Sequence, residues 1–219
     1  MISCIVPVYN NETTIAHVLN TLLSCKDIGE VIAIDDCSQD NSADILRTFE
    51  SRVKVSFNEI NYGKGYTVGK GIRSAKRDHI LTCDADLSKL QTRHIEALIQ
   101  EYQTGDYDMV IARRESGRGL TGLIGKVSGE RIYHRRVIEP YMDLIVEHGN
   151  GIEQIINYAH RGKKVKLIVS RDIGHIMKWQ RGDLRGCVPA YTKEVRQLLE
   201  TELILRKKSI ARRASMFFQ

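Results

Sequence analysis

Short apolar runs alternate with amphipathic segments through the first 112 residues, and this alternation leaves few folds open to the chain. Each run spans about five to seven residues, the length of a buried strand. Between the runs, apolar residues recur at helical spacing, as in 15–23 and 95–102. The pattern predicts an α/β fold with a mostly parallel sheet flanked by helices. The predicted strands are Ile2–Val8, Glu30–Ile34, Val53–Phe57, His79–Cys83 and Asp108–Ala112.

Size and composition fit one globular domain with a tail. The chain has 219 residues, of which 42% are hydrophobic and 27% charged, which excludes a disordered or collagen-like protein. No apolar run reaches the ~18–20 residues that cross a bilayer, and the segment after Met1 does not resemble a signal peptide. The five cysteines form no CxxC pair, so we expect neither a zinc cluster nor a disulfide framework, but reduced thiols in a cytoplasmic protein.

The pattern changes after Ala112. A glycine- and arginine-rich loop is predicted over 113–126, followed by helices over 133–147 and 151–161 and a strand over 165–169. Pro189 precedes a last helix that runs to about residue 208. We therefore predict a domain over 1–188, divided into halves at 112/113, and a C-terminal helix with a basic tail over 189–219.

The sharpest polar signal is Cys83-Asp84-Ala85-Asp86, directly after an apolar strand. Ligands of parallel sheets bind at the carboxyl ends of the strands. Two carboxylates one residue apart leave this strand end toward nearly the same side, where they could share a hard divalent cation with phosphate groups. The alternative is a pair of exposed aspartates in a turn. The apolar strand before them favours a metal site.

Three further polar segments follow strand ends: Pro7–Glu12, Asp35–Ser42 and Asn61–Gly65. Helix capping explains the later residues of the second segment, but not the paired acids Asp35 and Asp36, one of which could accept hydrogen bonds from a nucleobase or ribose. A phosphoribosyltransferase loop also begins with paired acids, but no Thr-Gly follows here. The third segment lacks GxGxxG spacing and is no dinucleotide fingerprint.

These four segments together resemble the family 2 glycosyltransferases, which have the glycosyltransferase A fold. The motifs occur in that family's order and approximate spacing over the first 90 residues. Polyprenyl-phosphate mannose synthases look most similar, because Val127-Ser128-Gly129-Glu130 and Gly151-Ile152-Glu153-Gln154 resemble two of their later elements. The resemblance covers about 175 residues and is looser in the second half. It implies that 1–112 binds the nucleotide sugar and that 113–188 faces the acceptor.

The resemblance also implies roles for individual residues. Asp86 would ligate Mg²⁺ or Mn²⁺ with Asp84, and Arg113 would reach the phosphates or the acceptor. The residues expected to contact the nucleotide are Pro7, Tyr9, Glu12, Ile34, Asp36, Lys64, Asp84 and Ala85. The chain departs from the synthases at Asn11, where they place an acid, and at Ser88, where they place a glutamine metal ligand.

A late segment could complete the site. His175 follows the last predicted strand, where many enzymes of this fold supply a histidine to the metal; a lone histidine is otherwise a surface or packing residue. Lys178, Arg181 and Arg185 lie in the same segment and carry enough positive charge to hold a diphosphate.

The reaction implied by the resemblance is transfer of a sugar from a GDP- or UDP-linked donor, with GDP slightly favoured over UDP, to an acceptor such as a lipid phosphate. The metal and basic side chains would neutralise the departing diphosphate. Glu130 and Glu153 are the candidates for a general base, although a phosphate acceptor needs no strong one, and a retaining reaction stays open. A nucleotidyltransferase and a non-catalytic nucleotide-sugar-binding protein are the alternatives.

The net charge of +6 is concentrated at the C-terminus, where five basic residues fall within 206–213 without an acid. Such a tail could contact anionic lipid or nucleic acid, or be solvated. We expect a peripheral association with the cytoplasmic face of a membrane to be its use, and no nucleic-acid partner. The sequence leaves a homodimer open.

Overall fold

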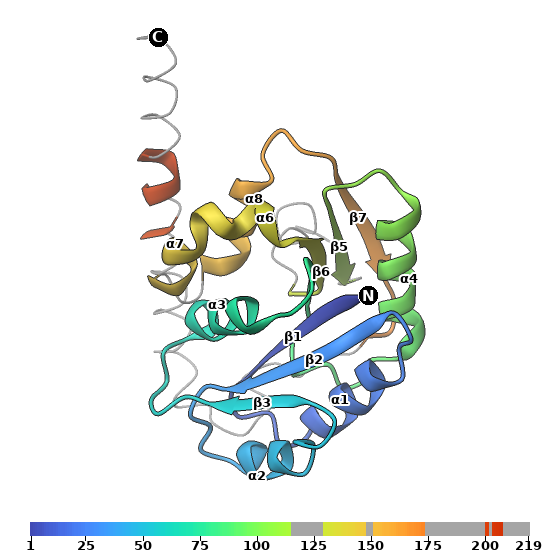
Figure 1. Cartoon of the computed structure of the whole chain (residues 1–219), viewed down its shortest axis with the longest axis vertical. Helices are drawn as coiled ribbons and strands as arrows, with labels where there is room; N and C mark the ends of the chain where they lie inside the picture. The colour runs from blue at the N-terminus through green and yellow to red at the C-terminus, as the bar shows by residue number, and fades with distance from the viewer. Residues whose placement is uncertain (115–128, 148–150, 174–199, 202, 208–219) are drawn as a thin grey trace.

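The computed structural model contains a seven-stranded sheet with helices on both faces (Figure 1). It describes residues 1–114, 129–147, 151–173, 200–201 and 203–207. The strand order is β3-β2-β1-β4-β6-β5-β7, and β6 alone among these strands runs antiparallel to its neighbours. The α/β fold with a mostly parallel sheet is therefore confirmed.

All five strands predicted for the first half are present: β1 (Ile2–Val8), β2 (Ile28–Asp35), β3 (Lys54–Phe57), β4 (His79–Thr82) and β5 (Met109–Arg114). The strand predicted over 165–169 is β7 (Val165–Ser170) at the sheet edge. Apolar runs identify these strands well because a parallel sheet is covered on both faces, so that nearly every residue of a central strand is buried.

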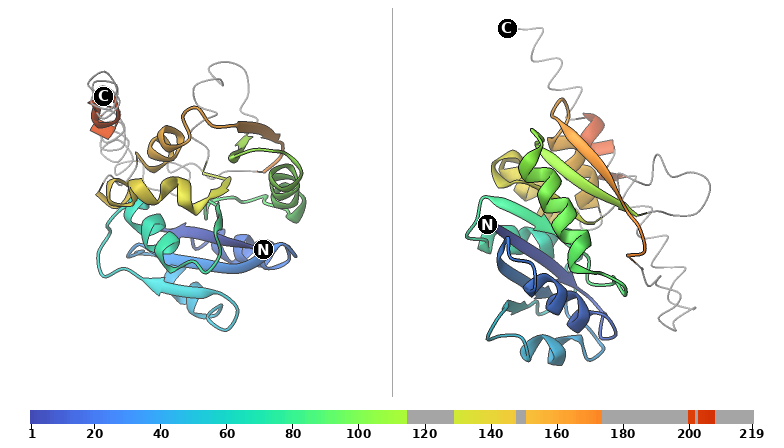
Figure 2. Two further views of the ribbon diagram at one scale, coloured as in Figure 1. Left: turned by 45° about the horizontal axis from the view of Figure 1, so that its top comes forward. Right: turned by 90° about the vertical axis from the view of Figure 1, so that its right-hand side faces the viewer.

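Two apolar clusters cover the two faces of the sheet (Figure 2). One cluster joins the sheet to α1 (Ile15–Leu23), α2 (Ser42–Arg47) and α4 (Thr92–Thr104). The other joins it to α3 (Lys64–Ser74), α7 (Met142–Glu147) and α8 (Ile152–Ala159). The predicted helix over 151–161 is thus α8, and residues 200–201 and 203–207 are helical as predicted. Among the described residues, no helix has the length and hydropathy to cross a bilayer.

The helix predicted over 133–147 is wrong in its first half. Residues Arg131–His134 form strand β6, which fills the space between β4 and β5, and the helical part begins with α6 (Arg135–Ile138). The 3₁₀ turn η2 (Glu139–Tyr141) then interrupts it, because Pro140 has no N–H to donate. Ile132 and Tyr133 are fully buried, and such β-branched and aromatic residues fit a central strand.

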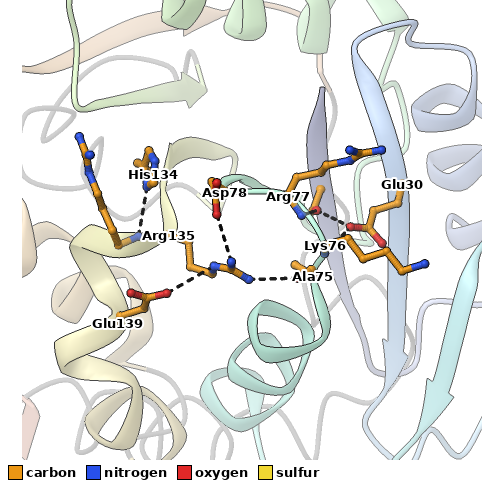
Figure 3. A network of polar contacts seen from close by, with 10 residues as sticks. Glu30, Ala75, Lys76, Arg77, Asp78, His134, Arg135 and Glu139 are labelled. Carbon is orange, nitrogen blue, oxygen red and sulfur yellow. Dashed lines mark hydrogen bonds and ion pairs between the residues drawn. The ribbon is translucent and has the colours of Figure 1, made fainter.

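A polar network joins the elements at the edge of the sheet where β1, β2 and β4 begin (Figure 3). Arg135 donates to the carbonyl oxygen of Ala75 at 3.0 Å and to Oδ1 of Asp78 at 3.1 Å, and it lies 3.5 Å from Oε1 of Glu139. Glu30 accepts hydrogen bonds from Ser3 Oγ and from the Lys76 main-chain N–H, both at 2.6 Å. The network therefore ties the end of α3 to β1, β2 and α6.

Replacing Arg135 by alanine should lower the free energy of unfolding by about 1–2 kcal/mol, because the substitution removes hydrogen bonds to a largely buried guanidinium. Urea denaturation measures this change. The control is Arg73→Ala, which breaks an ion pair with the exposed Asp143 and should cost less than about 0.5 kcal/mol. Equal costs for the two variants would show that the network does not hold the sheet edge together.

Candidate active site

A cleft lies at the opposite edge of the sheet, where β1 and β4 end. It encloses about 230 Å³, part of it open to solvent. Its walls come from β1, α3, the segment after β4, β6 and α8, so both halves of the domain contribute. The lining residues are Pro7, Lys64, Val68, Thr82, Asp84, Gly129, Arg131, Ile152, Glu153 and Ile156.

The centre of this cleft is an ion triad of Lys64, Asp84 and Glu153. The ammonium of Lys64 lies 2.8 Å from Oδ1 of Asp84 and donates to Oε1 of Glu153 at 2.6 Å. The exposed fractions of the side chains are 30% for Lys64, 17% for Asp84 and 8% for Glu153. Burial alone would lower the pKa of Lys64, but the two carboxylates outweigh it and the pKa is raised above its ordinary value.

Helix termini place the charges of the triad. Lys64 is the first residue of α3, and Glu153 lies in the first turn of α8. The partial positive charge of a helix N-terminus suits the glutamate and disfavours the lysine. The position of Lys64 therefore depends on the two carboxylates.

Arg131 is a member of the site that the sequence analysis did not identify. Its side chain is 1% exposed, and Nη1 donates to the carbonyl oxygen of Glu153 at 3.3 Å and to Oδ1 of Asn157 at 3.1 Å. Burial lowers the pKa of this guanidinium, with the carboxylates of Glu153 and Asp84 opposing the shift. An arginine beside the buried pair Ile132-Tyr133 was the available signal, but the segment was predicted as the start of a helix.

Gly129 fits closely against Asp84. A Cβ atom at this position would overlap Cγ, Oδ1 and Oδ2 of the aspartate. The carbonyl oxygen of Gly129 accepts a hydrogen bond from Thr82 Oγ1 at 2.7 Å, which fixes the main chain there. Only glycine leaves the Asp84 carboxylate where Lys64 can reach it.

Asp36 fastens the segment that carries Lys64. Oδ1 accepts hydrogen bonds from Asn58 Nδ2 at 2.8 Å and from the Tyr62 N–H at 3.0 Å, and Oδ2 accepts from the Gly63 N–H at 2.8 Å. Gly63 has φ +91°, a conformation that favours glycine. The nucleoside contact predicted for Asp36 stays a prediction, but three protein donors already engage this carboxylate.

The turn after β1 interlocks with the loop after β2. The main-chain N–H groups of Asn10 and Asn11 donate to Ser38 Oγ and Ser42 Oγ, at 2.9 and 2.8 Å. In return, Oε2 of Glu12 accepts from the Asn41 N–H at 3.0 Å. Glu12 therefore faces the neighbouring loop, and its predicted nucleotide contact stays a prediction.

The remaining predicted residues lie at or near the cleft in different environments. Tyr9 is 43% exposed, whereas Ile34 is buried in the core at 1%. Ala85 is buried, and its carbonyl oxygen accepts from Thr14 Oγ1 at 2.7 Å. Half-buried residues include Asp86, in the turn after β4, and Arg113, near the end of β5. Their roles stay predictions.

Glu130 is buried at 1% and is not among the residues that line the cleft, whereas Glu153 is. His175, Lys178, Arg181 and Arg185 lie outside the described residues. Within the described part of the chain, no three acidic, histidine or cysteine side chains converge as metal ligands. Asp84 and Asp86 supply carboxylate oxygens that suit Mg²⁺ or Mn²⁺, so the donor chemistry fits such a metal.

Replacing Gly129 by alanine should lower the free energy of unfolding by about 1–3 kcal/mol, because the new methyl group overlaps the Asp84 carboxylate. In an Asp84→Ala background the overlapping atoms are absent, and the same substitution should cost much less. Chemical denaturation of the four variants measures the difference. A cost that is equal in both backgrounds would contradict the close fit.

The sequence model described as Glycosyl transferase family 2 matches residues 3–175. An undecaprenyl-phosphate 4-deoxy-4-formamido-L-arabinose transferase from Edwardsiella ictaluri is 32% identical over 148 residues, which is 59% of this chain and 45% of that protein. The protein of the same description from Proteus mirabilis is 29% identical over 168 residues, 63% and 50% of the two chains. The chain thus spans about half the length of the curated relatives it matches.

Solved structures show the same fold at low sequence identity. Glucosyl-3-phosphoglycerate synthase from Mycobacterium tuberculosis, in complex with Mn²⁺, UDP and phosphoglyceric acid, has a TM-score of 0.74 and 17% identity, covering 94% of this chain and 78% of that one. TarS 1-349 from S. aureus has a TM-score of 0.62 and 22% identity, covering 76% and 57%. The glycosyltransferase A fold implied by the sequence resemblance is confirmed. Since the family match extends over well more than half of its length, the chain belongs to glycosyl transferase family 2.

Proposed function

We propose that this chain carries the catalytic site of a metal-dependent glycosyltransferase that moves a sugar from a nucleoside diphosphate to a polyprenyl phosphate. The observation that carries the proposal is the cleft at the carboxyl edge of the sheet, where Asp84 and Glu153 share the ammonium of Lys64. Parallel sheets bind their ligands at this edge. The family match supports the class of reaction.

The donor is a GDP- or UDP-linked sugar. The mycobacterial synthase of the same fold was crystallised with UDP and Mn²⁺, which supports UDP for this chain as well. Tyr9 is exposed at the end of β1, where a flat ring can lie against a base. Pro7 lines the cleft beside Lys64 and is placed to contact the nucleotide.

Asp84 and Asp86 would hold Mg²⁺ or Mn²⁺, with His175 as a further ligand. When bound, such an ion supplies positive charge for the diphosphate that leaves the sugar. Lys178 and Arg113 would add to this charge. Asp84 also faces Lys64, so the site that receives the negatively charged diphosphate already contains a lysine.

The acceptor is a phosphate on a polyprenyl chain, as the names of the curated relatives state for those proteins. A phosphate monoester is a nucleophile that needs no strong general base. Glu153 lines the cleft and is the better placed of the two candidate glutamates, whereas Glu130 is buried beside it. With a lipid phosphate as acceptor, we expect Glu153 to orient groups more than to remove a proton.

The test of function is transfer to undecaprenyl phosphate from a panel of nucleotide sugars with Mn²⁺. The wild type should release UDP or GDP only when the matching donor is present, and EDTA should abolish the release. Asp86→Ala should reduce the rate at least about a hundredfold while circular dichroism stays unchanged. Asp143→Ala removes an exposed aspartate far from the cleft and serves as the matched control.

Two results would contradict this proposal. Release of pyrophosphate in place of a nucleoside diphosphate would indicate a nucleotidyltransferase. Binding of nucleotide sugars without turnover of any donor would indicate a binding protein. A metal-independent rate in the wild type would remove the metal from the proposal and leave the transfer itself standing.

The basic tail would bring the site to the lipid. Arg206 and Lys207 are exposed, and Leu203 on the same helical segment is 59% exposed. Each basic residue near an anionic leaflet contributes about 1 kcal/mol, which gives reversible binding. We expect the chain to co-sediment with vesicles containing anionic lipid at low salt, and removal of residues 206–219 to abolish this. Lys163→Gln/Lys164→Gln, which removes two basic residues elsewhere, is the control; an equal loss in both variants would contradict a specific role of the tail.

A further inference from the structure

The helical segment of residues 200–201 and 203–207, here called the C-terminal segment, packs into the core. Thr201 is 1% exposed and Leu205 is 2% exposed. Leu205 belongs to the same apolar cluster as Ile152, Ile155 and Ile156 of α8. The segment lies on the side of the sheet that carries α7 and α8 (Figure 1). It is therefore part of the wall behind the cleft.

The closest approach between the C-terminal segment and α8 is at Gly151. A Cβ atom at this position would overlap Thr201 Oγ1 and lie 2.7 Å from Thr201 Cγ2 and 2.8 Å from Thr201 Cβ. The backbone of Gly151 has φ −92°, which any residue adopts. Glycine is needed here because Thr201 occupies the space of a side chain.

Gly151 is the N-cap of α8, two residues before Glu153. The first turn of α8 carries both contacts of Glu153 with the site: its carboxylate binds Lys64, and its carbonyl oxygen accepts from Arg131. A shift of the N-cap residue moves this turn and changes both contacts. Thr201 therefore lies where it can determine the position of Glu153 without touching the cleft.

We propose that Thr201 is a positioning residue of the active site, which seats the first turn of α8 through Gly151 and so sets Glu153 against Lys64. The effect on catalysis rests on the proposed function, whereas the effect on the Lys64–Glu153 ion pair does not. A C-terminal segment that merely adds stability would lower the melting temperature without changing the kinetics of the folded enzyme.

The kinetic test uses Gly151→Ala, alone and combined with Thr201→Ala. The single substitution should lower kcat about ten- to hundredfold, because small misplacements of a site residue have effects of this size, while KM for the donor stays within about twofold. Adding Thr201→Ala removes the two nearest atoms and should restore at least about fivefold of the lost rate. Leu203→Ala, an exposed position on the same segment, is the control and should leave kcat unchanged.

A second test does not depend on activity. Glu153→Gln breaks the ion pair with Lys64 and lowers the stability of the wild type. In a Gly151→Ala or a Thr201→Ala background the pair is already displaced, so the same substitution should lower the urea midpoint by roughly half as much or less. Thr201→Ala introduces no overlap and provides this measurement even where Gly151→Ala does not fold.

Equal effects of Glu153→Gln in all backgrounds would overturn the proposal, as would an unchanged kcat in folded Gly151→Ala. A wild type without transferase activity, combined with a reduced effect of Glu153→Gln in the variants, would refute the proposed function and leave the positioning role of Thr201 intact. The two ideas therefore fail separately.

Discussion

The ammonium of Lys64 between two largely buried carboxylates is the interaction on which the rest of the site depends. It joins α3, the segment after β4 and α8 at one point. Buried ion pairs are expensive to desolvate, and apolar replacements are often as stable, so the triad is better understood as a constraint on position than as a source of stability. Several unusual features of the chain serve this constraint: glycine at 129 leaves room for Asp84, and Asp36 holds the main chain that leads into Lys64.

The motifs of the first half are therefore parts of one connected arrangement. Asp36 binds the N–H groups of Tyr62 and Gly63, and the next residue reaches Asp84. The motif after β2 thus orients the motif before α3, which in turn orients the motif after β4. This chain of contacts explains why segments that are about 25 residues apart in sequence must be read together, and why Asp36 has a structural duty besides any contact with a nucleoside.

The first half of the fold could be predicted from the sequence because its strands are covered on both faces and read as continuous apolar runs. The cleft was predictable in part, since Asp84, Lys64 and Pro7 follow strand ends in segments that stand out by composition. Glu153 was identified through a family resemblance. Arg131 and β6 were missed because a four-residue strand with a charged first residue has no clear period, and its partners β4 and β5 lie far from each other in the sequence. The contact of Thr201 with Gly151 depends on packing between distant segments, which no local pattern encodes.

The antiparallel insertion of β6 has a consequence for how the protein is synthesised. β4 pairs with β1 on one side but has its other neighbour only in Arg131–His134. While the ribosome is still adding the residues between them, the emerging N-terminal half exposes one whole edge of a nearly complete apolar sheet. Unpaired edges of this kind recruit other strands, so this interval is the stage at which a nascent chain is most prone to aggregation. The strand that closes the sheet also brings Arg131 to Glu153, so completion of the fold and assembly of the cleft occur in one step.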